Sequence, residues 1–240
     1  MTLQDEVRAI VDDREHGSSA LLERIANLLK DQAANTTPRQ MRQAFAQLRE
    51  IDQSMVLVHH FLDAMEQHIE SNLAQAIESY QLHWQKVPAA VAENLRPMLN
   101  TIQPRVLVHS HSGLIIQVAQ ELARSGVKPS FWQTRSLPGG EGPLQAQDLC
   151  DAGFDVSLIE DEQISEVAHQ ADCAWLGMDQ YDTHGFVNKR GSAAIARTFT
   201  ECGKPVYALG DSRKKVATVK YSKELFEYTP FKRGIYLVKE

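Results

Sequence analysis

The spacing of apolar residues divides the chain into a helical first part and a second part with short apolar runs. Through about residue 100, apolar side chains recur every three or four positions, which predicts amphipathic helices. The stripes comprise Val7, Ile10 and Val11; Leu21, Leu22, Ile25, Leu28 and Leu29; Met41, Phe45, Leu48 and Ile51; and, in one long segment over 54–86, Val58, Phe61, Leu62, Met65, Ile69, Leu73, Ile77 and Tyr80. Such stripes are typical of a packed core rather than of a cofactor site.

Capping signals mark two of these helices. Ser18 and Ser19 are suited to capping the helix that holds the second stripe, because a serine hydroxyl accepts from the free N–H groups of the first turn. Thr37 followed by Pro38 predicts an N-cap and a first helical residue.

After Pro104 the pattern changes to short β-branched runs that alternate with helical periods. Alternation of this kind indicates right-handed βαβ units and a mostly parallel sheet. We therefore predict an α/β protein, with a Rossmann-like mostly parallel sheet preceded by an N-terminal helical domain. The predicted domains are a helical domain over 1–103 and a Rossmann-like ligand-binding domain over 104–240. The predicted strands lie at 105–109, 130–133, 154–159, 174–176, 205–209 and 234–238, and the predicted helices at 114–123, 144–151, 163–169 and from near Asn188.

Composition narrows the class of partner. The chain has 240 residues, of which 43% are hydrophobic and 23% charged, with a formal net charge of −6. Because nucleic-acid binding proteins normally present a basic face, we expect no direct nucleic-acid binding. The last forty residues lean basic, with Arg213, Lys214 and Lys215 in a row, and we interpret them as a solvated surface rather than a partner patch.

Cysteine usage and hydropathy suggest a cytoplasmic protein. Cys150, Cys173 and Cys202 are odd in number and show no CxxC spacing, which favours a reducing compartment and argues against a zinc motif. We see neither a secretory h-region nor an apolar run long enough to span a membrane. Histidines along 59–83 lack the spacing of a metal pair on one helical turn, so we expect neither a metal nor a cofactor.

Polar residues follow three of the predicted strands, where the carboxyl ends of parallel strands would form a ligand site. In the first loop, His109, Ser110, His111 and Ser112 precede a predicted helix whose N-terminus favours an anion. Helix capping by Ser110 or Ser112 is an equally good explanation of these residues.

The second loop places Arg135 before Gly139, Gly140 and Gly142. Glycines let the backbone approach a ligand, while a guanidinium binds phosphate or carboxylate with two hydrogen bonds. The loop matches neither the dinucleotide-binding glycine pattern nor a Walker loop.

The third segment runs from Gly177 to Ser192 after the apolar run 174–176, and we expect its Asn188-Lys189 pair to open a helix. Asp179 is a candidate general acid or base, and Lys189 offers a charge for a phosphate. Ordinary turn chemistry is the alternative. Together the three loops predict a polar crater in which Arg135 and Lys189 face one carboxylate, an arrangement that suits a phosphorylated polyol.

These motifs resemble a known superfamily. It joins methylthioribose-1-phosphate isomerase, ribose-1,5-bisphosphate isomerase and the regulatory subunits of eukaryotic translation initiation factor 2B. The stretch 134–138 with Glu141-Gly142 resembles the family's Thr/Ser-Arg-Pro loop and following Gly. Residues 177–179 resemble Gly-Ala-Asp, residues 187–192 the Asn-Lys-x-Gly-Thr segment, and residues 226–230 the closing Phe-Asp/Glu-x-Thr-Pro.

The resemblance implies roles for these residues. In the isomerase branches a phosphorylated aldose is opened and converted to a ketose. The family's Asp, here Asp179, and a Cys in the first loop carry the proton chemistry, while Arg135, Asn188 and Lys189 correspond to substrate-binding residues. The resemblance also implies a homo-oligomer, formed through the Rossmann-like domain.

The sequence departs from the family at two places. The Thr-His-Cys-Asn motif reads 108–111 here, so Ser110 stands in place of the Cys, and a hydroxyl is far less acidic than a thiol. His109 or His111 is a candidate base for that hydroxyl. The Arg-Gly-Ala loop reads His16-Gly17-Ser18, which removes a phosphate-binding Arg and leaves Gly17 as its matching position.

Three functions remain open. We favour a protein that binds a sugar phosphate or nucleotide without the Cys-dependent isomerase chemistry. The alternatives are an aldose–ketose isomerase that acts on a phosphorylated ribose through Asp179 and Ser110, and a purely structural subunit.

Overall fold

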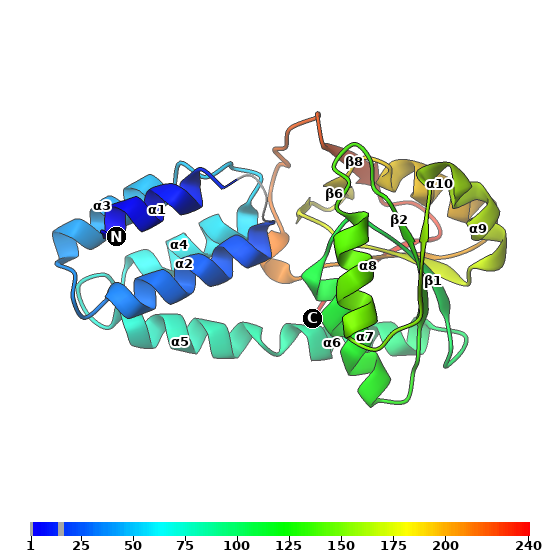
Figure 1. The fold of residues 1–240 in the computed structure, drawn as a ribbon, viewed down its shortest axis with the longest axis horizontal. Helices are drawn as coiled ribbons and strands as arrows, with labels where there is room; N and C mark the ends of the chain where they lie inside the picture. The colour runs from blue at the N-terminus through cyan, green and yellow to red at the C-terminus, as the bar shows by residue number, and fades with distance from the viewer. Residues whose placement is uncertain (1, 14–16) are drawn as a thin grey trace. The chain divides into compact units, whose positions relative to one another are not determined.

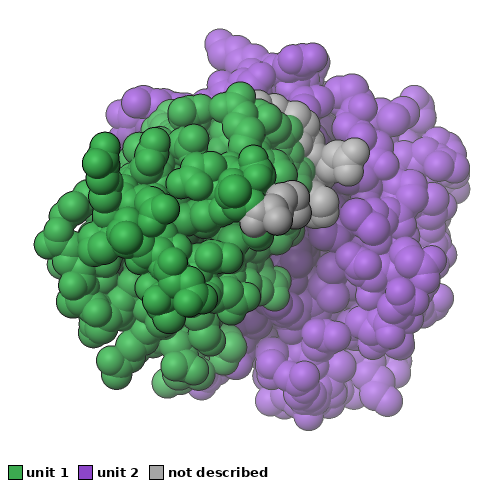
Figure 2. All heavy atoms as spheres, turned by 60° about the vertical axis from the view of Figure 1, so that its left-hand side comes forward, with its two compact units in different colours: residues 1–86 green, residues 87–240 purple. Residues whose placement is uncertain are grey.

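The computed structural model describes residues 2–13 and 17–240, which form two compact units, 1–86 and 87–240 (Figure 2). Unit 1 holds α1 (Leu3–Val11), α2 (Ser18–Gln32), α3 (Pro38–Leu48), α4 (Val56–Glu66) and α5 (Leu73–Trp84). Its core is built from the predicted apolar stripes, and Phe61 and Leu62 are fully buried there. The predicted boundary at residue 103 lies beyond the division between units, because α6 (Val87–Leu95) packs on elements of the second unit.

Local signals account for some helix boundaries and not for others. The Thr37 hydroxyl accepts from the Gln40 N–H while the Gln40 side chain accepts from the Thr37 N–H, so the predicted cap of α3 is present. The predicted cap at Ser18 and Ser19 is wrong, because Gly17 is the N-cap of α2 and both serines lie inside the helix. The long helical segment over 54–86 is broken by a turn at 67–72, since apolar periodicity alone does not report where a helix reverses.

Unit 2 contains a six-stranded sheet in the order β3-β2-β1-β4-β7-β9. Every neighbouring pair that carries a register is parallel, which confirms the predicted fold class. The strands are β1 (Arg105–His109), β2 (Ser130–Thr134), β3 (Val156–Ile159), β4 (Cys173–Leu176), β7 (Val206–Leu209) and β9 (Ile235–Val238). The central strand β4 is buried at all four positions, as expected for a parallel sheet covered on both faces.

Helices cover both faces of this sheet (Figure 1). On one side lie α7 (Gly113–Arg124) and α8 (Gly142–Asp151), and on the other lie α9 (Ile164–Gln170) and α10 (Ser192–Glu201). This arrangement follows from right-handed crossovers that leave the central strand in two directions. None of the helices in the described part of the chain has the length and apolar character needed to cross a membrane.

The sequence patterns did not predict a second, smaller sheet. It is antiparallel and consists of β5 (Gln180–Tyr181), β6 (Gly185–Lys189) and β8 (Phe226–Pro230). The expectation that Asn188 opens a helix is therefore wrong: Asn188 pairs with Glu227 inside the sheet, and α10 begins only at Ser192. All five residues of β6 are buried, although its polar residues resemble a loop in sequence.

Gly142 is required where the β2 loop enters α8. A Cβ at this position would lie 1.8 Å from the Thr134 carbonyl oxygen, whereas a Cβ at Gly113 would meet nothing within 4 Å. We expect Gly142→Ala to lower the free energy of unfolding by about 1–3 kcal/mol, since backbone must move. The control Gly113→Ala should be neutral or stabilising by about 0.5 kcal/mol. Equal unfolding midpoints for the two variants in urea would contradict this account.

Candidate functional site

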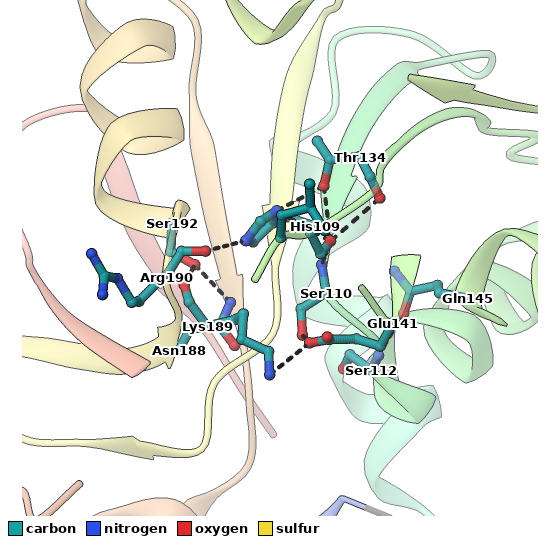
Figure 3. A network of polar contacts seen from close by, with 12 residues as sticks. His109, Ser110, Ser112, Thr134, Glu141, Gln145, Asn188, Lys189, Arg190 and Ser192 are labelled. Carbon is teal, nitrogen blue, oxygen red and sulfur yellow. Dashed lines mark hydrogen bonds and ion pairs between the residues drawn. The ribbon is translucent and has the colours of Figure 1, made fainter. Parts of the chain in front are cut away.

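Loops that follow β1, β2 and β4 meet residues of β6 at the carboxyl edge of the large sheet (Figure 3). The structure brings together His109, Ser110, Glu141 and Lys189 from three of these segments. The β4 loop joins them at Gly177, where a Cβ would lie 3.0 Å from the Ser112 side chain and 3.8 Å from Asn188 Oδ1. Gly177 thus allows the close approach of the first and third predicted loops.

Hydrogen bonds of His109 link the segments that meet at this site. Its Nε2 lies 2.8 Å from the Arg190 carbonyl oxygen, so this nitrogen carries the proton and donates. Its Nδ1 is then the acceptor for the Thr134 hydroxyl at 2.7 Å. The Ser136 hydroxyl contacts Thr134 Oγ1 at 3.0 Å and accepts from the Ser110 N–H at 2.7 Å. One hydrogen-bonded chain therefore connects β1, β2 and the end of β6.

This environment keeps His109 neutral. The ring is 1% exposed, and burial lowers its pKa, because taking a charge out of water is unfavourable. A Cβ at Gly191 would lie 2.8 Å from the ring, so only glycine fits beside it. Since both ring nitrogens are engaged, His109 has a positioning role and is not placed as a base for the Ser110 hydroxyl.

Ser110 and Lys189 both contact the Glu141 carboxylate. The Ser110 hydroxyl donates to Glu141 Oε1 at 2.6 Å, and Lys189 Nζ lies 3.0 Å from the same oxygen. Lys189 also lies 5.2 Å from the centre of the Phe226 ring. The sequence identifies Glu141 only as part of a family motif and predicts no role for it. Its position just before a helix, next to two glycines, gave no signal of these contacts.

A buried pair of amides supports the start of α7. The side chains of Gln133 and Gln145 are fully buried and bond to each other at 2.9 Å. Gln145 Oε1 accepts from the Ser112 N–H, and Gln133 donates to the Thr134 carbonyl oxygen. Ser112 stands at the N-cap position of α7, but neither its hydroxyl nor that of Ser110 makes a capping hydrogen bond among the described residues. The capping alternative is therefore wrong for this loop.

Asp179 lies just beyond β4, with no hydrogen bond or ion pair from its carboxyl to any residue the structure describes. Burial raises its pKa, against the charges of Lys214 and Lys189, which lower it. Lys214 is 7% exposed, and its ammonium donates to the Met178 carbonyl oxygen at 2.5 Å. The interpretation of 213–215 as a solvated surface is wrong for Lys214, because a short run of charges in sequence does not report burial.

Asn188 and Lys189 hold their places in β6 through the first turn of α10. The Asn188 amide donates to Ser192 Oγ at 2.9 Å, and that hydroxyl donates to the Lys189 carbonyl oxygen at 2.7 Å. The N-terminus of α10 is already occupied, because Glu227 Oε1 accepts from the N–H groups of Gly191 and Ala193 at 2.8 Å each. This helix therefore offers no free anion site.

The remaining predicted residues have other partners. Arg135 is exposed, and its Nε donates to Glu160 at 2.7 Å. His111 pairs with Asp148 of α8 at 2.8 Å, and no contact joins it to the Ser110 hydroxyl among the described residues. Gly17 belongs to unit 1, and His16 lies outside the described residues. No group of three His, Cys, Asp or Glu side chains in the described ranges could hold a metal ion.

A Rossmann-like sheet with polar loops at its carboxyl edge defines the class of this protein. The chain belongs to the initiation factor 2 subunit family, whose model matches residues 8–232.

Named relatives include both enzymes and translation factors. The chain is 27% identical over 110 residues to ribose 1,5-bisphosphate isomerase of Archaeoglobus fulgidus, a match that covers 45% of this chain and 35% of the relative. It is 25% identical over 112 residues to translation initiation factor eIF2B subunit alpha of Caenorhabditis elegans, covering 46% and 37%. The matched segment thus spans little more than a third of either relative.

Solved structures show the same fold over most of the chain. Translation initiation factor eIF-2B of Pyrococcus horikoshii OT3 aligns with a TM-score of 0.82 and 18% identity, covering 99% of this chain and 94% of that one. The 5-methylthioribose 1-phosphate isomerase of the same organism aligns with a TM-score of 0.76 and 17% identity, covering 95% and 80%. The same fold therefore occurs in a solved structure named as a translation factor and in one named as an enzyme.

The buried His109 predicts a pH dependence of stability. Its pKa in the folded protein lies below 6.5, so the unfolded chain takes up a proton first as the pH falls. The contribution of His109 to the free energy of unfolding is complete above pH 6.5 and is lost as the pH decreases. The free energy of unfolding then falls by at most about 1.4 kcal/mol per pH unit. Urea denaturation between pH 7.5 and 5.5 measures it.

The variant that tests this prediction is His109→Gln, whose free energy of unfolding should change less with pH than that of the wild type. An unchanged slope, or an NMR titration in which the folded His109 ring protonates at an ordinary imidazole pKa, would contradict this account.

Proposed function

We propose that this protein binds a phosphorylated sugar or a nucleotide at the strand-end loops and lacks the Cys-dependent isomerase chemistry that the family resemblance implies. The observation that carries the proposal is the Asp179 carboxyl, which burial keeps at a raised pKa and which has no partner among the described residues. Groups that are left without partners at a cost in stability are typical of ligand sites. Hydroxyl groups of a sugar are suitable donors to this carboxyl.

The phosphate would be bound by the cation on β6. Lys189 is only 9% exposed, and its ammonium lies beside the Ser110 hydroxyl through their common contact, Glu141. The first turn of α7 has no side-chain cap and adds backbone N–H groups to the same loop. We assign Asn188 and the backbone around Gly142 to the same ligand, and we propose His109, His111 and Arg135 as further contacts or supports.

The contacts of Ser110 argue against thiol-like chemistry. Its hydroxyl donates to a carboxylate that is already paired with Lys189, so this contact holds the hydroxyl in place. No histidine among the described residues contacts this hydroxyl, so the pairing that activates a serine nucleophile is missing. We therefore assign Ser110 a binding role rather than a catalytic one.

A second candidate function is an aldose–ketose isomerase that acts on a phosphorylated ribose. One observation favours it: the raised pKa of Asp179 brings the carboxyl closer to the range in which it can both give and accept a proton near neutral pH. The match to an archaeal ribose 1,5-bisphosphate isomerase is consistent with such a substrate. In either case we expect a cytoplasmic homo-oligomer that binds neither membranes nor nucleic acid.

Thermal-shift measurements on a panel of sugar phosphates and nucleotides test the binding function. We expect at least one compound to raise the midpoint of unfolding, because a ligand present at 100 times its Kd stabilises by about 2.7 kcal/mol. Lys189→Met should abolish the shift, whereas Lys215→Met should keep it, since Lys215 is exposed. A shift that survives Lys189→Met would place the ligand elsewhere, and no shift with any compound would leave only the structural subunit.

NMR of each stabilising ligand separates the two functions. A sugar phosphate that remains unchanged over hours supports binding alone. Conversion to the ketose, together with a loss of at least about 100-fold in rate in Asp179→Asn, would overturn the binding-only proposal and establish the isomerase.

A further inference from the structure

The Glu141 carboxylate lies where the loops after β1 and β2 meet the end of β6. Its Oε1 accepts from the Ser110 hydroxyl at 2.6 Å and lies 3.0 Å from Lys189 Nζ (Figure 3). Hydroxyl and ammonium groups are also the donors that bind phosphate oxygens. The Glu141 carboxylate thus occupies the two donors, Ser110 and Lys189, that an anionic ligand would require.

The backbone of the glycine-rich loop closes over this ion pair. A Cβ at Gly139 would lie 2.1 Å from Glu141 Oε2 and 2.7 Å from Lys189 Nζ, so a larger residue here would displace the ends of these two side chains. Gly140 has a φ of +74°, a conformation that glycine adopts without strain and that turns the chain here. The glycine-rich loop therefore lies directly against the Glu141–Lys189 ion pair.

Charge then decides which ligands can enter. Glu141 is the ion-pair partner of Lys189 among the described residues, and Lys189 is buried. An anion that arrives beside an unmoved Glu141 is repelled in an environment where screening by water is weak. A phosphate dianion carries more charge and more acceptor oxygens than one carboxylate and can replace it, whereas a carboxylate ligand gains nothing by exchange.

We propose that Glu141 determines the specificity of this site by occupying the ligand's anion position in the free protein, so that only a phosphate-bearing ligand displaces it from Ser110 and Lys189. This inference rests on the proposed function and deepens it. It assigns the site to phosphomonoesters and excludes sugar acids, and it gives the second loop a role in selecting the ligand.

Isothermal titration calorimetry on the full chain tests the proposal with three probes: inorganic phosphate, ribose 5-phosphate and ribonate. Glu141→Gln keeps the size of the side chain and an oxygen that accepts from Ser110, but it frees the charge of Lys189. We expect this variant to bind inorganic phosphate and ribose 5-phosphate at least about tenfold more tightly than the wild type, and to bind ribonate, which the wild type excludes.

The matched control is Glu121→Gln, which removes the same charge at the far end of α7, where Glu121 pairs with Arg124. It should bind each probe within about twofold of the wild type. If Glu141→Gln does not fold by circular dichroism, Glu141→Ala removes the same carboxylate and carries the same expectation.

The outcomes distinguish this inference from the function on which it rests. Binding by the wild type together with equal or weaker binding by the Glu141 variant would overturn the inference alone, because Glu141 would then help to hold the ligand. Absence of phosphate binding in the wild type and in both folded variants would overturn the inference and the proposed function together.

Discussion

The organisation of this site depends on one buried, neutral imidazole. His109 ends β1, accepts from Thr134 at the end of β2 and donates to the Arg190 carbonyl oxygen beyond β6. Ser110 and Ser136, the two serines that extend this chain of hydrogen bonds, both have a positive φ, which non-glycine residues adopt only when their surroundings enforce it. The imidazole thus supports two loops whose serines have this unusual backbone conformation.

Two ionisable groups of the candidate site, Asp179 and Lys189, are arranged at a cost to stability. The half-buried Asp179 carboxyl has no partner among the described residues, and the Lys189 ammonium is satisfied only by Glu141 and the face of Phe226 among the described contacts. A protein selected for stability alone would pair or remove these groups. Their presence at the carboxyl edge of a parallel sheet supports the proposal of a phosphorylated ligand.

Most of the fold could be predicted, because buried strands such as β4 appear as apolar runs and amphipathic helices as stripes. The convergence of the loops after β1 and β2 followed from topology, since these parallel strands end at one edge, whereas Lys189 reaches that edge from the antiparallel sheet. The predictions that failed concern residues whose burial or pairing is set by tertiary packing. Asn188 and Lys189 lie in a fully buried strand despite their polarity, Lys214 is buried within a basic run, and Arg135 pairs with Glu160 outside the ion-pair cluster. Local sequence carries no signal for these outcomes.

A crystal structure of the wild-type protein grown with ribose 5-phosphate tests the central claim most directly. The account predicts phosphate density within hydrogen-bond distance of Lys189 Nζ and the Ser110 hydroxyl, with the sugar hydroxyls directed at Asp179. Density at another surface, with the Ser110–Glu141–Lys189 contacts unchanged, would contradict the claim that these strand-end loops form the ligand site.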